Sequence, residues 1–151
     1  MRRLCWAAAL SLIAVAGAAI AAAPADTVRS RIAGYRALGA AFKSANDTVR
    51  SGDVRSPRLQ QAAAQISAAA RRQYQWFPAG SGPQAQVKTA ARPEIWTRAA
   101  QFRSAQDGFA RQAVAFERTV RGGNAAAIRT EARKLGGQCK ACHDQFRVPH
   151  D

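Results

Sequence analysis

The feature that most constrains this chain is the spacing of its apolar residues, which recur in steps of three and four from residue 27 almost to the end. Such spacing gives an α-helix one apolar stripe, whereas a half-buried strand would show strict alternation. Much of the apolar content is alanine, which favours helices, and runs of β-branched residues are almost absent. The sequence therefore predicts an all-α protein.

Residues 1–25 differ from the rest and have the three parts of a secretory signal peptide. Two arginines precede an almost uninterrupted apolar stretch over residues 4–20, and small residues follow it. We expect cleavage between Ala21 and Ala25, which leaves one domain over residues 26–151, exported to the periplasm. The alternative is a retained membrane anchor, although the apolar run is short for a transmembrane helix.

Four amphipathic helices are predicted in the exported part. They cover residues 27–50, residues 57 to about 74, residues 93–122 and residues 124–146, with Asn124 as the N-cap of the last. A crossover loop rich in glycine and proline joins the second helix to the third. Helices joined by short turns and one longer loop predict an antiparallel four-helix bundle.

The last predicted helix carries the most specific motif of the chain. Cys139, Cys142 and His143 form C-x-x-C-H, the attachment signal of a c-type haem. The two cysteines are close to one helical turn apart, so both thiols can reach vinyl groups of one porphyrin, and the adjacent histidine can approach the iron. Both cysteines fall on the apolar stripe, so the haem would lie against the bundle interior.

Three other roles are compatible with these residues. A reactive dithiol of the thioredoxin type needs a strand-to-helix context, which this sequence lacks. Zinc bound by the motif together with His150 has the right number of ligands, but adjacent side chains on a helix diverge. A disulfide between the two cysteines inside a helix would be strained. Haem attachment is the favoured interpretation, since the predicted export suits the maturation of c-type haem proteins.

With this motif near its C-terminus, the chain resembles the class II c-type cytochromes, the family that includes the cytochromes c′. The resemblance also rests on residues 31–39, on Trp76-Phe77-Pro78 and on residues 92–96. It implies an antiparallel four-helix bundle with one covalent haem held mainly by the last helix, often assembled as a homodimer through the first two helices. A peroxidase would need a distal acid–base residue, and no free histidine is available for that role, so we do not expect an enzyme.

The resemblance also bears on the sixth position of the iron. Low-spin members of the family use a methionine of the first helix, and Tyr35 occupies that place here, while the only methionine is Met1. We therefore expect a pentacoordinate iron with His143 as its sole protein ligand, because His150 would have to wrap round the ring. Tyr35 would then shield the iron, donate a hydrogen bond to a bound diatomic ligand, or coordinate the iron directly. The alternative is that Tyr35 is an ordinary aromatic residue of the core.

Two arginines are placed near the haem by the same resemblance. Arg147 follows His143 by four residues, one further turn, where its guanidinium could pair with a propionate or stand beside the imidazole. Arg31 would contact a propionate or cover the distal side. Each could equally be a solvated surface charge.

The chain is strongly basic, with a formal net charge of +14. A basic surface would speed the encounter with an acidic redox partner protein or an anionic membrane, or it is simply a set of solvated faces. Nucleic acid does not suit an exported haem protein. The sequence thus predicts one-electron transfer, and the alternative is a module that binds or scavenges nitric oxide or carbon monoxide without an electron-carrier role.

Overall fold

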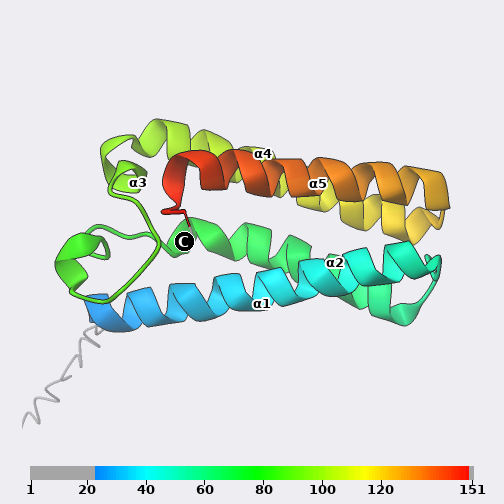
Figure 1. Ribbon diagram of the computed structural model, residues 1–151, viewed down its shortest axis with the longest axis horizontal. Coiled ribbons are helices and arrows are strands. Elements are labelled where there is room, and N and C mark those ends of the chain that lie inside the picture. Colours follow the sequence, from blue (N-terminus) through cyan, green and yellow to red (C-terminus); the bar gives the residue numbers. More distant parts are fainter. Residues whose placement is uncertain (1–22, 150–151) are drawn as a thin grey trace, which may run out of the picture.

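The computed structural model describes residues 23–149, and the four long helices of that part form an antiparallel four-helix bundle (Figure 1). The helical elements in chain order are α1 (Pro24–Ser51), α2 (Pro57–Arg72), η1 (Gln73–Gln75), η2 (Pro83–Ala85), α3 (Glu94–Thr97), α4 (Ala99–Gly122) and α5 (Ala125–Phe146). No strand occurs among residues 23–149, where an isolated bridge pairs Ala91 with Arg147. The prediction of an all-α four-helix bundle is confirmed.

The turns between paired helices have conventional caps. α1 and α4 end at Gly52 and Gly123, whose φ values of 83° and 69° lie in the left-handed region that glycine adopts without a steric penalty. The Ser56 hydroxyl accepts a hydrogen bond from the Leu59 N–H at the start of α2. The Asn124 side chain does the same for α5, as its predicted N-cap role requires.

The third predicted helix is interrupted, so the expectation of one helix over residues 93–122 is wrong. α3 ends at Thr97, and Arg98 leaves the helical region with φ −121° and ψ 47° before α4 begins. The short α3 is turned toward the crossover loop, where the Trp96 indole N–H donates to the Pro78 carbonyl at 3.3 Å. Contacts with the loop thus override a continuous helical pattern.

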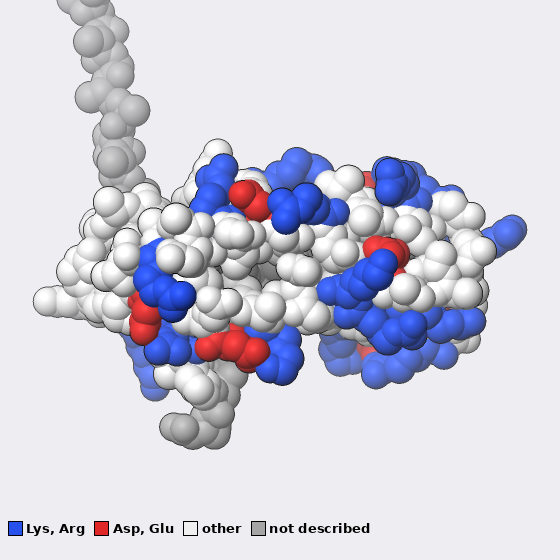
Figure 2. Space-filling view, turned by 90° about the horizontal axis from the view of Figure 1, so that it is seen from above, with Lys and Arg blue, Asp and Glu red and all other residues white. Residues whose placement is uncertain are grey.

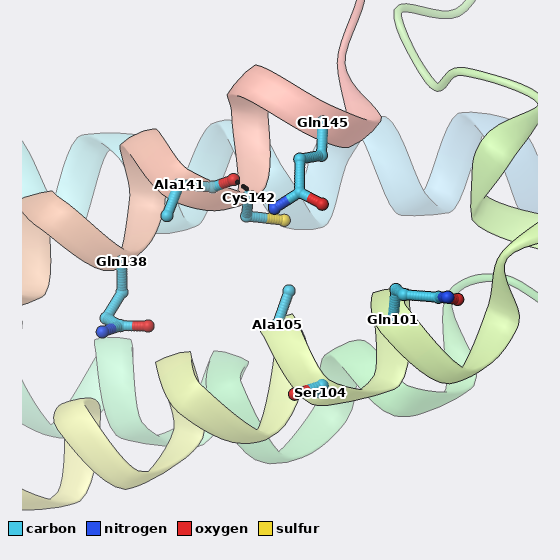
Figure 3. A pocket seen from close by; sticks show the side chains of 7 residues that line it. All are labelled: Gln101, Ser104, Ala105, Gln138, Ala141, Cys142 and Gln145. Carbon is cyan, nitrogen blue, oxygen red and sulfur yellow. Dashed lines mark hydrogen bonds between the residues drawn. The ribbon is translucent and has the colours of Figure 1, made fainter.

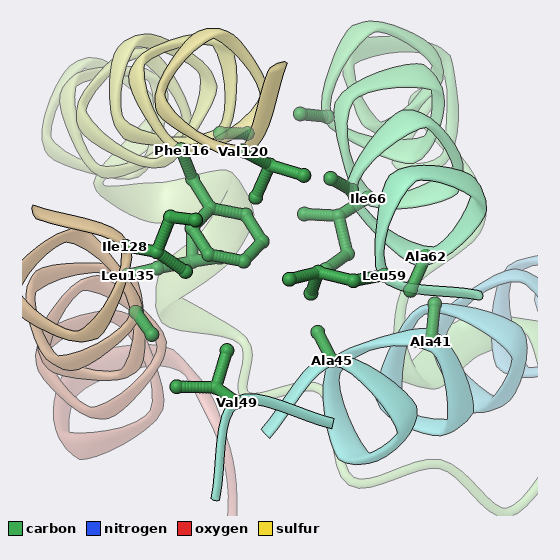
Figure 4. Close-up of a cluster of buried hydrophobic side chains, with 14 of the residues drawn as sticks. Ala41, Ala45, Val49, Leu59, Ala62, Ile66, Phe116, Val120, Ile128 and Leu135 are labelled. Atoms are coloured by element: carbon green, nitrogen blue, oxygen red, sulfur yellow. The ribbon is translucent and has the colours of Figure 1, made fainter. Parts of the chain in front are cut away.

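The main hydrophobic core fills the bundle toward the end where the short turns lie (Figure 4). Its largest fully buried side chains are Leu59 and Ile66 of α2, Phe116 of α4, and Ile128 and Leu135 of α5. Alanines of α1 and α2 face them and allow the helices to approach closely. A smaller cluster of Ile95, Phe102 and Phe146 lies at the opposite end.

The bundle is not closed equally on all sides. Long stretches of α1 pack on α2, of α2 on α4 and of α4 on α5, whereas α1 and α5 touch over a much shorter stretch. Residues 23–149 contain no helix long and apolar enough to cross a membrane. The predicted signal peptide, with Met1, falls largely on residues 1–22, which lie outside the described residues, as does His150.

Candidate functional site

The two cysteines of the motif lie on the inner side of α5, near its C-terminal end. Both are half-buried free thiols, and Cys139 packs against the main core while Cys142 packs against the smaller cluster. Burial raises the pKa of both thiols, that of Cys142 to about 11, to which the nearby Cys139 contributes. A reactive dithiol needs the opposite shift, so this environment does not suit the redox alternative. The disulfide alternative is also not present in the structure.

The Cys142 sulfur faces a cavity of about 290 Å³ between α4 and α5 (Figure 3). The small Ala105 of α4 lies across from it and leaves room beside the thiol. The other residues that line the cavity are mostly polar: Gln101, Ser104, Gln138, Ala141 and Gln145. A bulky group bonded to Cys142 would therefore have apolar surface on its inner side and polar side chains toward solvent.

His143 and Arg147 line a second cavity of about 330 Å³ together with Arg92. Arg147 follows the last residue of α5 and is extended, with φ −121° and ψ 136°, while its N–H closes the last helical turn by donating to the His143 carbonyl at 3.1 Å. The departing chain is held to the segment before α3, because the Arg92 N–H donates to the Phe146 carbonyl at 3.0 Å. The structure still brings the predicted imidazole and guanidinium to one cavity.

Tyr35 projects from the inner side of α1 and is half-buried. Its ring meets Trp76 edge to face at 4.8 Å between centroids and lies 6.0 Å from Phe77. We call Tyr35, Trp76 and Phe77 the aromatic wall. Burial raises the pKa of Tyr35 well above its ordinary value, and charge on Cys142 and Cys139 adds to this rise. The phenol of Tyr35 thus lies close enough to the thiols of Cys142 and Cys139 for their charges to interact.

Arg31, one turn before Tyr35, is only 2% exposed. Its guanidinium donates to the carbonyls of Trp76 and Ser81. Burial lowers the pKa of this guanidinium, and charge on Tyr35 acts in the opposite direction. The alternative of a solvated surface charge is therefore wrong for Arg31.

Sequence reasoning missed several residues that shape this region. Ser81 and Arg92 are in irregular segments, where no periodicity indicates which side chains turn inward. Gln101 and Gln138 line the cavity beside Cys142. Their helices also carry exposed polar residues, so the sequence did not distinguish these two glutamines from side chains that face solvent.

The donor set and its surroundings fit a covalently held porphyrin. Two neutral thiols stand on one helix face, an imidazole follows directly, and aromatic side chains cover the interior side. No group of three or more His, Cys, Asp or Glu is arranged to hold a bare metal ion in the part of the chain that the structure describes. The zinc alternative also requires His150, outside that part.

Comparisons with known proteins agree with this fit. The family model described as Cytochrome C′ matches residues 26–147. A cytochrome c′ of Rubrivivax gelatinosus is 37% identical over 59 residues, which are 39% of this chain and 46% of that protein, so the alignment spans about half of the relative.

Solved structures agree over nearly their whole length. A cytochrome c′ with ligand-controlled dimer dissociation has a TM-score of 0.74 and 22% identity, with 85% of this chain and 99% of that chain covered. The nitric oxide complex of a cytochrome c′ variant from Alcaligenes xylosoxidans has a TM-score of 0.73 and 24% identity, with 85% and 98% covered.

Proposed function

Since this chain belongs to the cytochrome c′ family, whose members bind a c-type haem with iron, we propose that it is an exported one-electron carrier with a pentacoordinate iron. When bound, the haem supplies the one-electron chemistry and an open position for a small ligand. Cys139 and Cys142 would hold the haem, His143 would bind its iron, and Tyr35 would shield the iron from solvent. The observation that carries this proposal is the packing of the two motif cysteines, Cys139 and Cys142, against the two apolar clusters of the bundle.

Cys139 and Cys142 would each be bonded to the haem through a thioether. Their half-burial against two apolar clusters supports this role, because a macrocycle fixed to both sulfurs would be pressed against the bundle interior. The short contact between α1 and α5 leaves the bundle least closed where the haem would enter. The haem would thus be enclosed by helices on its inner side and have an edge toward solvent.

His143 would be the axial ligand. His143 lines a cavity together with Arg92 and Arg147, and the positive charge of Arg147 would stabilise the reduced haem, since reduction removes positive charge from the iron. Arg92 is itself paired with Glu94 at 2.8 Å, which fixes its position. Arg147 is half-buried, so its charge would act through a medium less polar than water.

Tyr35 would cover the opposite face of the iron. A raised phenol pKa keeps its hydroxyl protonated at neutral pH, so it can donate a hydrogen bond to a bound diatomic ligand. With Tyr35 where low-spin relatives use methionine, and Met1 the only methionine of the sequence, no thioether is available to close the other side of the iron.

Gas binding is the second candidate function. The similarity to a cytochrome c′ with bound nitric oxide favours it, as does a site that contains a tyrosine where low-spin relatives use methionine. The same iron could serve both functions, but a change of spin state adds reorganisation energy to electron transfer. In either case the chain binds haem and a partner or ligand, and we do not propose an enzyme.

The partner of an electron carrier would be an acidic protein. Lys and Arg outnumber Asp and Glu on the visible face of Figure 2, and they are spread along the bundle rather than gathered in one patch. Such a surface attracts anionic partners over a wide range of orientations, and salt weakens the attraction. We also propose a homodimer, since one similar protein is a dimer that its ligand controls.

Optical titration of the exported protein tests the proposal. The ferric form should be high-spin, and the ferrous form should bind carbon monoxide. His143→Ala should alter both spectra while the haem remains tethered by its thioethers, and Arg133→Ala, an exposed residue of the same helix, should alter neither. A low-spin spectrum without carbon monoxide uptake, or an unchanged spectrum in His143→Ala, would contradict the assignment.

A further inference from the structure

The Arg31 guanidinium is one of the most completely enclosed polar groups in residues 23–149. Nη1 donates to the Ser81 carbonyl and the Ser81 hydroxyl, both at 3.1 Å, and to the Trp76 carbonyl at 3.3 Å. Nη2 donates to the same Ser81 carbonyl at 3.1 Å. The guanidinium carbon lies 4.6 Å from the centroid of the Phe77 ring and 5.7 Å from that of Trp96. The cation thus connects α1 to both ends of one loop.

This set of contacts needs an arginine. Nη1 reaches the Trp76 carbonyl, Nη2 joins it on the Ser81 carbonyl, and the flat faces of the same planar group lie against the rings of Phe77 and Trp96. A lysine ammonium carries one nitrogen and no flat face, so it could not bond twice to the Ser81 carbonyl or stack on the rings as a planar group does. Because the loop carbonyls of Trp76 and Ser81 point inward at the cation, loss of the guanidinium would leave them without these donors.

The chain that carries the aromatic wall is fixed on its other side by α4. Gln73 and Gln106 are buried, and each side-chain amide donates to the other's backbone carbonyl, at 3.2 and 3.1 Å. Beyond this point Trp76 lies against α1, so close to Gly34 that a Cβ there would be 2.7 Å from the ring. Trp76 in turn meets Tyr35 edge to face. The wall is therefore held by α4 where the loop begins and by Arg31 where the loop ends.

The geometry points to Arg31 as a positioning residue that holds the aromatic wall over the distal side, and so sets how fast a small diatomic ligand reaches the iron. This inference rests on the proposed function, in which the iron has an open position opposite His143. It needs no contact between Arg31 and the haem. All four hydrogen bonds of the Arg31 guanidinium are made to Trp76 and Ser81. Arg31 therefore affects access to the iron by holding the loop that carries the aromatic wall.

The test compares Arg31→Gln and Arg31→Lys with Arg36→Gln in the haem-loaded protein, since Arg36 is exposed on the same helix. The association rate of carbon monoxide with the ferrous form reports access to the iron. Hydrogen exchange of residues 76–82, followed by mass spectrometry, reports the loop independently of ligand binding. Both Arg31 variants should accelerate loop exchange on the order of tenfold and speed carbon monoxide association, while Arg36→Gln should match the parent protein.

Other results would overturn the inference. Unchanged loop exchange in Arg31→Gln, faster loop exchange without faster association, or full rescue by Arg31→Lys would each contradict a wall held by the guanidinium fork. If Arg31→Gln does not fold, Ser81→Ala removes the hydroxyl acceptor of Arg31, together with that hydroxyl's own bond to the Pro78 carbonyl, and leaves the Ser81 carbonyl in place, so it should show both effects more weakly. Parent protein that takes up no carbon monoxide would instead refute the open iron of the proposed function, and the access role with it.

Discussion

The contact between Trp76 and Gly34 allows a quantitative prediction from a pair of matched variants. A Cβ at Gly34 would lie 2.7 and 2.9 Å from two atoms of the Trp76 ring, whereas a Cβ at Gly39, on the same helix, would meet nothing within 4 Å. Either change from glycine to alanine gains about 1 kcal/mol of helix propensity. At Gly34 the ring must also move, and overpacking of this kind costs about 1–3 kcal/mol.

The two variants should therefore separate. Gly39→Ala should stabilise the protein by about 1 kcal/mol, and Gly34→Ala should be less stable than Gly39→Ala by about 1–3 kcal/mol. Urea unfolding followed by far-ultraviolet circular dichroism measures both free energies of unfolding, if the slopes of the two transitions agree. Equal stabilisation by the two alanines would refute the close approach of Trp76 to α1, and with it the packing of the wall.

Three further predictions concern the bundle itself. Phe116→Ala should lower the free energy of unfolding by about 3–5 kcal/mol in urea titration, because this ring is completely buried; a loss below about 1 kcal/mol would contradict the core. Asn124→Ala should cost about 1 kcal/mol through loss of the hydrogen bond to the Ala127 N–H, and thermal melts with no change would argue against the cap. Hydrogen bonds from Lys134 and Gln112 lower the pKa of Glu131. The stability that this carboxylate adds is therefore fully present above the ordinary glutamate pKa, and it is lost as pH falls through the lowered pKa. Glu131→Gln should thus flatten the acid side of the stability profile, and an unchanged profile would contradict that linkage.

Local signals in the sequence were sufficient for the helices and for most of their ends. Glycines after α1 and α4 and Asn124 before α5 act through the nearest few residues, so the caps could be predicted without knowledge of the fold. The break at Arg98 could not, because the apolar spacing continues across it and only contacts of Trp96 with the loop favour the interruption.

In the candidate site, too, the features set by neighbouring residues could be predicted, and those set by distant contacts could not. The motif lies within five consecutive residues of one helix, so Cys139, Cys142 and His143 were found by spacing alone, and their bonds to haem remain a prediction. Arg31 was singled out through resemblance, but its burial and its bonds to Ser81, 50 residues away, depend on how the loop folds back on α1. The extended conformation of Arg147 likewise depends on pairing with Ala91, far away in the sequence.

The most direct measurement is the intact mass of the exported protein after denaturation and solvent extraction of free haem, followed by mapping of the peptide that contains the motif. Attachment through Cys139 and Cys142 predicts the mass of the cleaved chain plus one haem, with the added mass on that peptide. A chain that emerges without the added mass, or with it on another peptide, would contradict the account.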